Sequence, residues 1–164
     1  MRIIKEGIRD EFITLLQTVK ADCVIVTPVI SPILTELLVA HLQPAIAVKI
    51  LTQFTAEEIN TGVLNYDFGS KLEPCFQDLW IGVLEILEAH LFVFDQRIAL
   101  LTTADLTNNG LLASTDYGTM YTDPVELENI GSAVNELLSS ATGFSSSNPM
   151  IDQAPVPPGT MDNI

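Results

Sequence analysis

Hydrophobic and polar positions alternate with clear periods in the first third of the chain. Within residues 5–20, apolar residues fall at positions 8, 12, 15, 16 and 19, which form one face of a helix. Residues 22–29 are β-branched and almost wholly apolar, as is typical of a central strand covered on both faces. Ser31 as a cap and Pro32 at the first position then predict a helix to about residue 42. Residues 45–51 predict a second buried strand.

The rest of the chain predicts two more helical segments, several strands and a final helix. Thr55 and Glu58 form a capping box that predicts a helix start, and residues 71–80 predict another helical segment. Strand-like runs follow at 81–87, 90–95, 97–103 and 117–122, with a turn at Asp95-Gln96. Pro124 begins a helix with an apolar stripe to residue 138. This order predicts an α/β fold with a mixed β-sheet flanked by helices on both faces.

The predicted domain covers residues 1–142 as a single unit, because 164 residues suit one domain with a substantial core. Residues 143–164 are rich in Ser and Pro and show no period, so we predict a disordered tail there. A short linear motif in that tail is the alternative interpretation.

Charge and composition narrow the class of partner. Seven basic against 21 acidic residues give a formal net charge of -14, a field that repels phosphate backbones and anionic lipids. We therefore expect no nucleic-acid partner and no membrane association. No apolar run reaches bilayer length and charges interrupt the first residues, so we expect a cytoplasmic protein. Cys23 and Cys75 lack metal-ligand spacing and are expected to be reduced thiols.

Residues 87–124 carry the candidate chemistry, in the order strand, tight turn, strand, polar loop, strand. The candidate site residues there are Glu88, His90, Asp95, Thr102, Thr103, Asp105 and Asp116.

This stretch resembles the C-terminal part of a phospholipase D-like domain. That family places a His-x-Lys-x4-Asp motif on one strand, then a hairpin turn and a strand ending in Gly-Ser-x-Asn. Matching Asp95 to the motif Asp puts His90 at the Lys position and Glu88 at the His position. Residues 102–105 then fall on Gly-Ser-x-Asn, and Asp116 stands near the family's acidic residue. The motif is therefore degenerate in this chain.

A second register takes His90 as the motif His, which puts Phe92 at the Lys position and Arg97 at the Asp position. It also breaks the strand pairing, so we prefer the first register.

In the preferred register the substitutions weaken a phosphate site. The family's His is a nucleophile and its Lys supplies a fixed positive charge to phosphate oxygens. Glu88 is instead an anion, and His90 is positive only when protonated, a form that Glu88 would favour. Asp105 adds another negative charge, whereas Thr103 keeps a hydroxyl and Asp116 keeps a carboxylate. Glu88, Asp95, Asp105 and Asp116 would then crowd one pocket.

The resemblance implies two functions. We expect a non-catalytic domain that acts in dimerisation or in binding a protein partner, because the family builds one site from two motif copies and this chain has one. The alternative is a phosphodiesterase or nuclease that uses His90 and Glu88 across a homodimer; a regulator of an active relative is a third reading.

No cofactor and no metal are expected, with a divalent cation on the carboxylates as the alternative. Individually, His90 could be a structural strand histidine, and Asp95 is expected to accept backbone hydrogens in the turn.

Overall fold

A mixed eight-stranded sheet forms the centre of the molecule. The computed structural model describes residues 1–53, 67–103 and 117–145. The strand order is β1-β7-β6-β5-β2-β3-β4-β8. Strands β2, β3 and β4 run parallel, and the remaining neighbours pair antiparallel. The strands are β1 (Arg2–Ile4), β2 (Asp22–Val26), β3 (Ala47–Gln53), β4 (Asp78–Leu84), β5 (His90–Phe94), β6 (Ile98–Thr102), β7 (Gly118–Tyr121) and β8 (Thr142–Ser145).

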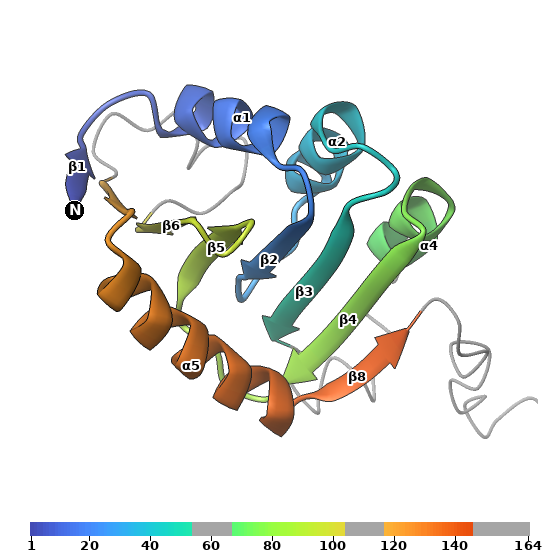
Figure 1. The fold of residues 1–164 in the computed structure, drawn as a ribbon. Coiled ribbons are helices and arrows are strands. Elements are labelled where there is room, and N and C mark those ends of the chain that lie inside the picture. Colours follow the sequence, from blue (N-terminus) through green and yellow to red (C-terminus); the bar gives the residue numbers. More distant parts are fainter. Residues whose placement is uncertain (54–66, 104–116, 146–164) are drawn as a thin grey trace, which may run out of the picture.

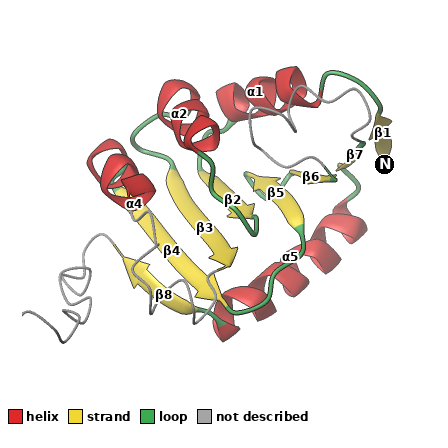
Figure 2. Ribbon diagram, turned by 180° about the vertical axis from the view of Figure 1, so that it is seen from behind, coloured by secondary structure: helices red, strands yellow, loops and turns green. Residues whose placement is uncertain are grey.

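Helices cover both faces of this sheet (Figures 1 and 2). One face carries α1 (Ile8–Thr18), α2 (Pro32–His41) and the short α4 (Asp67–Leu72), which continues into the 3-10 turn η1 (Glu73–Cys75). The other face carries α5 (Pro124–Ser140). This arrangement confirms the predicted α/β fold with a mixed sheet between helices.

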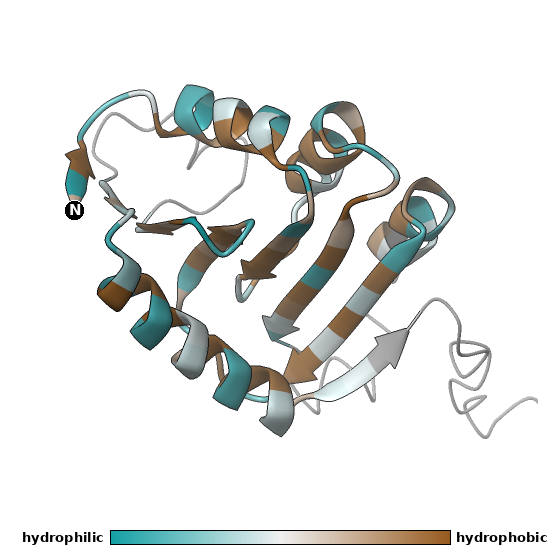
Figure 3. Cartoon of the chain, viewed as in Figure 1, coloured by the Kyte–Doolittle hydropathy of each residue, from teal (hydrophilic) through white to brown (hydrophobic). Residues whose placement is uncertain are grey.

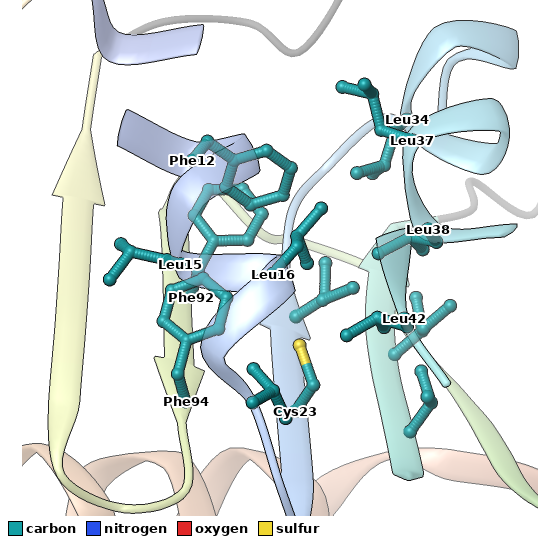
Figure 4. Close-up of a cluster of buried hydrophobic side chains, with 14 of the residues drawn as sticks. Phe12, Leu15, Leu16, Cys23, Leu34, Leu37, Leu38, Leu42, Phe92 and Phe94 are labelled. Atoms are coloured by element: carbon teal, nitrogen blue, oxygen red, sulfur yellow. The ribbon is translucent and has the colours of Figure 1, made fainter. Parts of the chain in front are cut away.

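The larger core lies under α1 and α2 (Figure 4). Phe12 of α1 packs edge-on against Phe92 of β5, with ring centroids 4.9 Å apart, and against Phe94 at 6.1 Å. Cys23 of β2 is completely buried in this core. Burial, and then the negative charges of Asp22 and Asp95, raise the pKa of its thiol, so Cys23 packs as a small neutral side chain.

The smaller core lies between α5 and the opposite face of the sheet, where Val26, Leu51, Val93 and the helix residue Val134 belong to one cluster of buried side chains. Figure 3 shows hydrophilic and hydrophobic residues alternating along α5, whereas the central strands are largely hydrophobic. On this face α5 supplies the cover that α1, α2 and α4 provide on the other.

Strand β8 extends the fold beyond the predicted domain end at residue 142. Gly82 of β4 pairs with Gly143 of β8, and the indole of Trp80 lies against both glycines. A Cβ atom would come within 2.1 Å of that ring at Gly82 and 2.4 Å at Gly143. Residues 143–145, predicted as tail, therefore belong to the sheet through their pairing with β4. Glycine at positions 82 and 143 leaves the room that the Trp80 ring occupies. Residues 146–164 lie outside the described residues.

Other boundaries also differ from the prediction. The helical segment predicted at 71–80 ends earlier, since η1 finishes at Cys75 and β4 begins at Asp78. The sequence pattern also missed β1, which pairs with β7. The predicted helix start at Thr55 lies outside the described residues. The cap at Ser31 is confirmed, because its side chain accepts the N–H of Leu34.

Candidate functional site

Several strand ends meet at one edge of the sheet and build the candidate site. In the register of the sheet, Val26 pairs with Leu91, so Thr27 follows β2 beside the start of β5 at His90. His90 pairs with Thr102 on β6, and Thr102 pairs with Gly118 on β7. The residues before β5, after β2 and after β6 therefore lie together.

His90 is half-buried and contacts the hydroxyl of Thr27. The ring nitrogen Nδ1 lies 3.1 Å from Thr27 Oγ1. Thr27 is completely buried, and its hydroxyl also donates to the carbonyl of Val29 at 3.1 Å. The hydroxyl of Thr27 is a partner of His90 that lies outside the motif-bearing segment of residues 87–124.

Glu88 is exposed and precedes β5, so it is not part of the strand itself. The backbone next to it is fixed, because the N–H of Leu87 donates to Gln53 Oε1 at 2.9 Å and the Leu87 side chain is buried. Gln53 ends β3, so this bond ties the β4–β5 connection to the same edge of the sheet. Glu88 itself is exposed, two residues before His90 in the chain.

Thr103 uses its hydroxyl within the backbone framework. It accepts the N–H of Tyr117 at 3.2 Å, and the N–H of Thr103 donates to the carbonyl of Tyr117 at 3.0 Å. The neighbouring Thr102 hydroxyl donates to the same carbonyl at 3.1 Å. These bonds join the end of β6 to the start of β7, which gives Thr103 a structural role.

Asp95 lies at the opposite end of β5 from His90. This corrects the prediction that Asp95 shares one pocket with Glu88 and His90. Asp95 is five positions after His90 along the extended chain, a distance of roughly 16 Å. Asp95 accepts the backbone N–H groups of Lys20, Ala21 and Asp22. Burial works to raise the pKa of this carboxyl, but these three amides, with help from Arg97, hold it below its ordinary value.

The expected structural role of Asp95 is confirmed, with one difference. Its donors come from the α1–β2 connection, whereas the sequence pointed to the turn that contains Asp95 itself. The turn at Asp95-Gln96 is also confirmed, since both residues have left-handed backbone angles, with φ of 51° and 54°.

Asp105 and Asp116 lie outside the described residues, so their predicted places in the site stay predictions. Among the residues that the structure does describe, no three histidine, cysteine or acidic side chains gather as they would around a metal ion. In that same part of the chain, every helix is too short or too polar to cross a bilayer.

Sequence reasoning missed two residues at this edge, Thr27 and Gln53. Both directly follow or end a buried strand, and neither stands in the motif-bearing segment. Their signal in the sequence is a polar residue at the end of a strongly apolar run, which marks the edge of a sheet but does not say which strand lies beside it.

Comparisons with known proteins agree on the fold. No protein-family model matches the sequence, and no curated protein matches it either. Among solved structures, NucT from Helicobacter pylori is similar with a TM-score of 0.70 and 12% identity, over 87% of this chain and 98% of that chain. Nuc from Salmonella typhimurium, a phospholipase D family member, has a TM-score of 0.69 and 13% identity, over 87% and 94%.

A third similar structure is TrmBL2, an archaeal chromatin protein described as binding DNA. Its TM-score is 0.56 at 10% identity, over 87% of this chain and 52% of that chain. Identities this low establish architecture alone. Together with the strand order and the helices on both faces, they show that this chain has a phospholipase D-like fold, as its sequence predicted.

Proposed function

We propose that this chain is a non-catalytic phospholipase D-like domain that pairs with itself or with a protein partner. The observation that supports this most is the contact of His90 Nδ1 with the neutral hydroxyl of Thr27. In the preferred register His90 stands where the family has its lysine. A histidine engaged by a hydroxyl supplies no fixed positive charge for a phosphate group.

The charge at this edge works in the same direction. Glu88, which replaces the family's nucleophilic histidine in this register, is an exposed carboxylate. An anionic ester approaching it meets repulsion, and the whole chain has a formal charge of -14. Catalysis of phosphodiester cleavage requires the opposite arrangement, with donors and cations aimed at the developing charge.

Pairing is supported by exposed apolar side chains beside the site. Val29, two residues after Thr27, is 55% exposed, and Ile86, two residues before Glu88, is 79% exposed. Their loops lie at the same edge of the sheet as His90. A second copy that brought its own edge to this one would remove both side chains from water in a symmetric contact.

The activity test uses purified protein on bis(p-nitrophenyl) phosphate and on DNA, at several pH values and with or without Mg²⁺. The matched control is His90→Ala. We expect no turnover above that of the control. Turnover by the unaltered protein that His90→Ala abolishes would replace this proposal with the phosphodiesterase or nuclease alternative.

The pairing test is sedimentation of the protein over a range of concentrations. Ile86→Asp is expected to shift a dimer towards monomer, because a charge would be buried at the contact. Val125→Asp is the control, since Val125 is 66% exposed but lies on the first turn of α5. A protein that stays monomeric, or a dimer that Val125→Asp disrupts as much as Ile86→Asp, contradicts pairing through this edge.

A further inference from the structure

The face of the sheet that carries α5 is covered over one row of residues and exposed over the next. Ala99 of β6 is completely buried in the cluster under α5, and its β7 partner Tyr121 packs against that cluster. Two residues further along β6, Leu101 points to the same face but is 41% exposed. Helix α5 begins at Pro124, just beyond the end of β7 that is remote from the site (Figure 2). On β6 the cover that α5 provides therefore ends before Leu101.

The exposed row forms a band of uncharged, mostly apolar side chains across four neighbouring strands. The register places Leu101 beside Leu91 of β5 on one side and Thr119 of β7 on the other. Thr119 in turn pairs with Ile3 of β1, the last strand in the sheet order, and Ile3 is 57% exposed. Residues paired across strands point to the same face, and Leu91 packs against the cluster under α5. The band of Leu91, Leu101, Thr119 and Ile3 therefore lies on the α5 face.

This band continues into the pairing edge proposed above. Leu87, in the connection that leads into β5, is buried in the same cluster as Val26, and Val26 is the β2 partner of Leu91. Ile86, the neighbour of Leu87, is 79% exposed and stands at the β5 end of the band. The band and Ile86 thus form one exposed apolar surface.

We propose that a second copy of this chain docks on the band, with the two-fold axis close to Leu101. The inference rests on the self-pairing proposed above and extends that contact from the edge of the sheet onto the α5 face. Leu101 stands near the middle of the surface, and a two-fold axis there exchanges the two ends. Leu101 then meets its own counterpart in the second copy, and Ile86 of each copy meets Ile3 of the other. The exposed apolar side chains leave water together.

Charge favours a second copy as the occupant. The chain has a formal net charge of -14, whereas no residue of the band is charged, so two copies repel each other less there than at their acidic surfaces. Exposed Glu85 and Glu88 flank Ile86 at one end. At the other end Lys5, which follows β1, offsets the neighbouring Glu6. The two-fold exchange places the acidic end of each copy against an end without net charge, rather than against a second acidic end.

The test is sedimentation of the full chain carrying Leu101→Asp or Leu101→Lys, each alone and the two mixed. Alone, each variant should dissociate at least about tenfold more readily than the unaltered protein, because two like charges meet at the axis. An equimolar mixture should regain the dimer, because a carboxylate then faces an ammonium group across the axis. Val39→Asp is the control that should leave the dimer unchanged, since Val39 is 44% exposed on α2, on the opposite face of the sheet.

The outcomes separate this inference from the pairing itself. A dimer that Ile86→Asp weakens but both Leu101 variants leave intact would overturn docking on the band and keep pairing through the edge. Single variants that are monomeric, and stay monomeric when mixed, would overturn the axis at Leu101. A protein that is monomeric at every concentration defeats the self-pairing and the inference with it. Circular dichroism shows whether the variants fold; if they do not, Ile3→Asp takes their place, and a dimer that it leaves unchanged contradicts the band.

Discussion

The two ends of strand β5 differ in what their polar residues do. At one end, Asp95 accepts three backbone N–H groups from the segment that links α1 to β2. At the other end, His90 contacts the hydroxyl of Thr27 and Glu88 is exposed to water. In the preferred motif register, Asp95 is the residue that agrees with the phospholipase D motif. Its carboxylate joins the start of the β5–β6 turn to the α1–β2 connection. The positions that differ from the motif, Glu88 and His90, lie at the other end of β5, so the proposed loss of the phosphate site leaves the anchoring contacts of Asp95 in place.

The largest loss of stability should come from a substitution of Asp95, at the end of β5 that is anchored to the α1–β2 connection. Asp95→Ala removes the acceptor of three backbone N–H groups and places alanine at a φ of 51°. We expect a loss of about 2–3 kcal/mol in the free energy of unfolding, measured by urea denaturation. Glu88→Ala at the other end is the matched carboxylate control and should cost less than about 0.5 kcal/mol. Equal losses at both ends would remove the contrast between them.

At the site end, the largest loss of stability should come from Thr27→Val. The variant keeps the β-branched shape but leaves the Val29 carbonyl and His90 Nδ1 without the buried hydroxyl. We expect a loss of about 1–2 kcal/mol in the free energy of unfolding, with Thr27→Ser recovering most of it. A loss above that of Asp95→Ala would mean that the site end is the better anchored of the two.

Much of the fold could be predicted from the sequence, because its elements have a regular hydrophobic period and end at recognisable capping and turn residues. Local sequence patterns alone predicted several elements. These are the apolar stripe of α1, the apolar strands β2 and β3, and the cap of α2 at Ser31. The elements that were missed depend on distant partners. Strand β1 has only three residues, and β8 is defined by the fit of Gly143 under Trp80 on another strand.

The site was less readable, for a related reason. Spacing along β5 put Glu88, His90 and Asp95 in one motif, but a strand of five residues carries its two ends far apart. The contact of His90 with Thr27 joins residues 63 positions apart in the sequence. Such a pairing follows only from the antiparallel register of β2 and β5, which no local pattern specifies.

The two ends should also respond differently to acid. The pKa of Asp95 is held below its ordinary value, so its carboxylate stabilises the fold above the unfolded-state pKa of about 3.9, and this contribution is lost as the pH falls through the lower folded-state pKa. The stability gap between the unaltered protein and Asp95→Asn should therefore be full at pH 7 and shrink below about pH 4. Urea denaturation across this range measures it. A gap that grows on acidification would reverse the assigned sign.

The smallest effect should be a gain, from Gln96→Gly at the anchored end. Gln96 has a φ of 54°, a conformation that costs a residue with a Cβ about 1 kcal/mol and costs glycine almost nothing. The change also removes an exposed bond from Gln96 Nε2 to Asp22 Oδ2 at 3.3 Å, and glycine gains freedom in the unfolded chain. We expect a net gain of about 0.5 kcal/mol, or roughly 1–2 °C in the midpoint of thermal unfolding. The control Gln96→Ala should give no gain, because alanine keeps the strained Cβ. A gain with glycine alone would show that the left-handed backbone of Gln96 is strained, whereas no gain with glycine would contradict that strain.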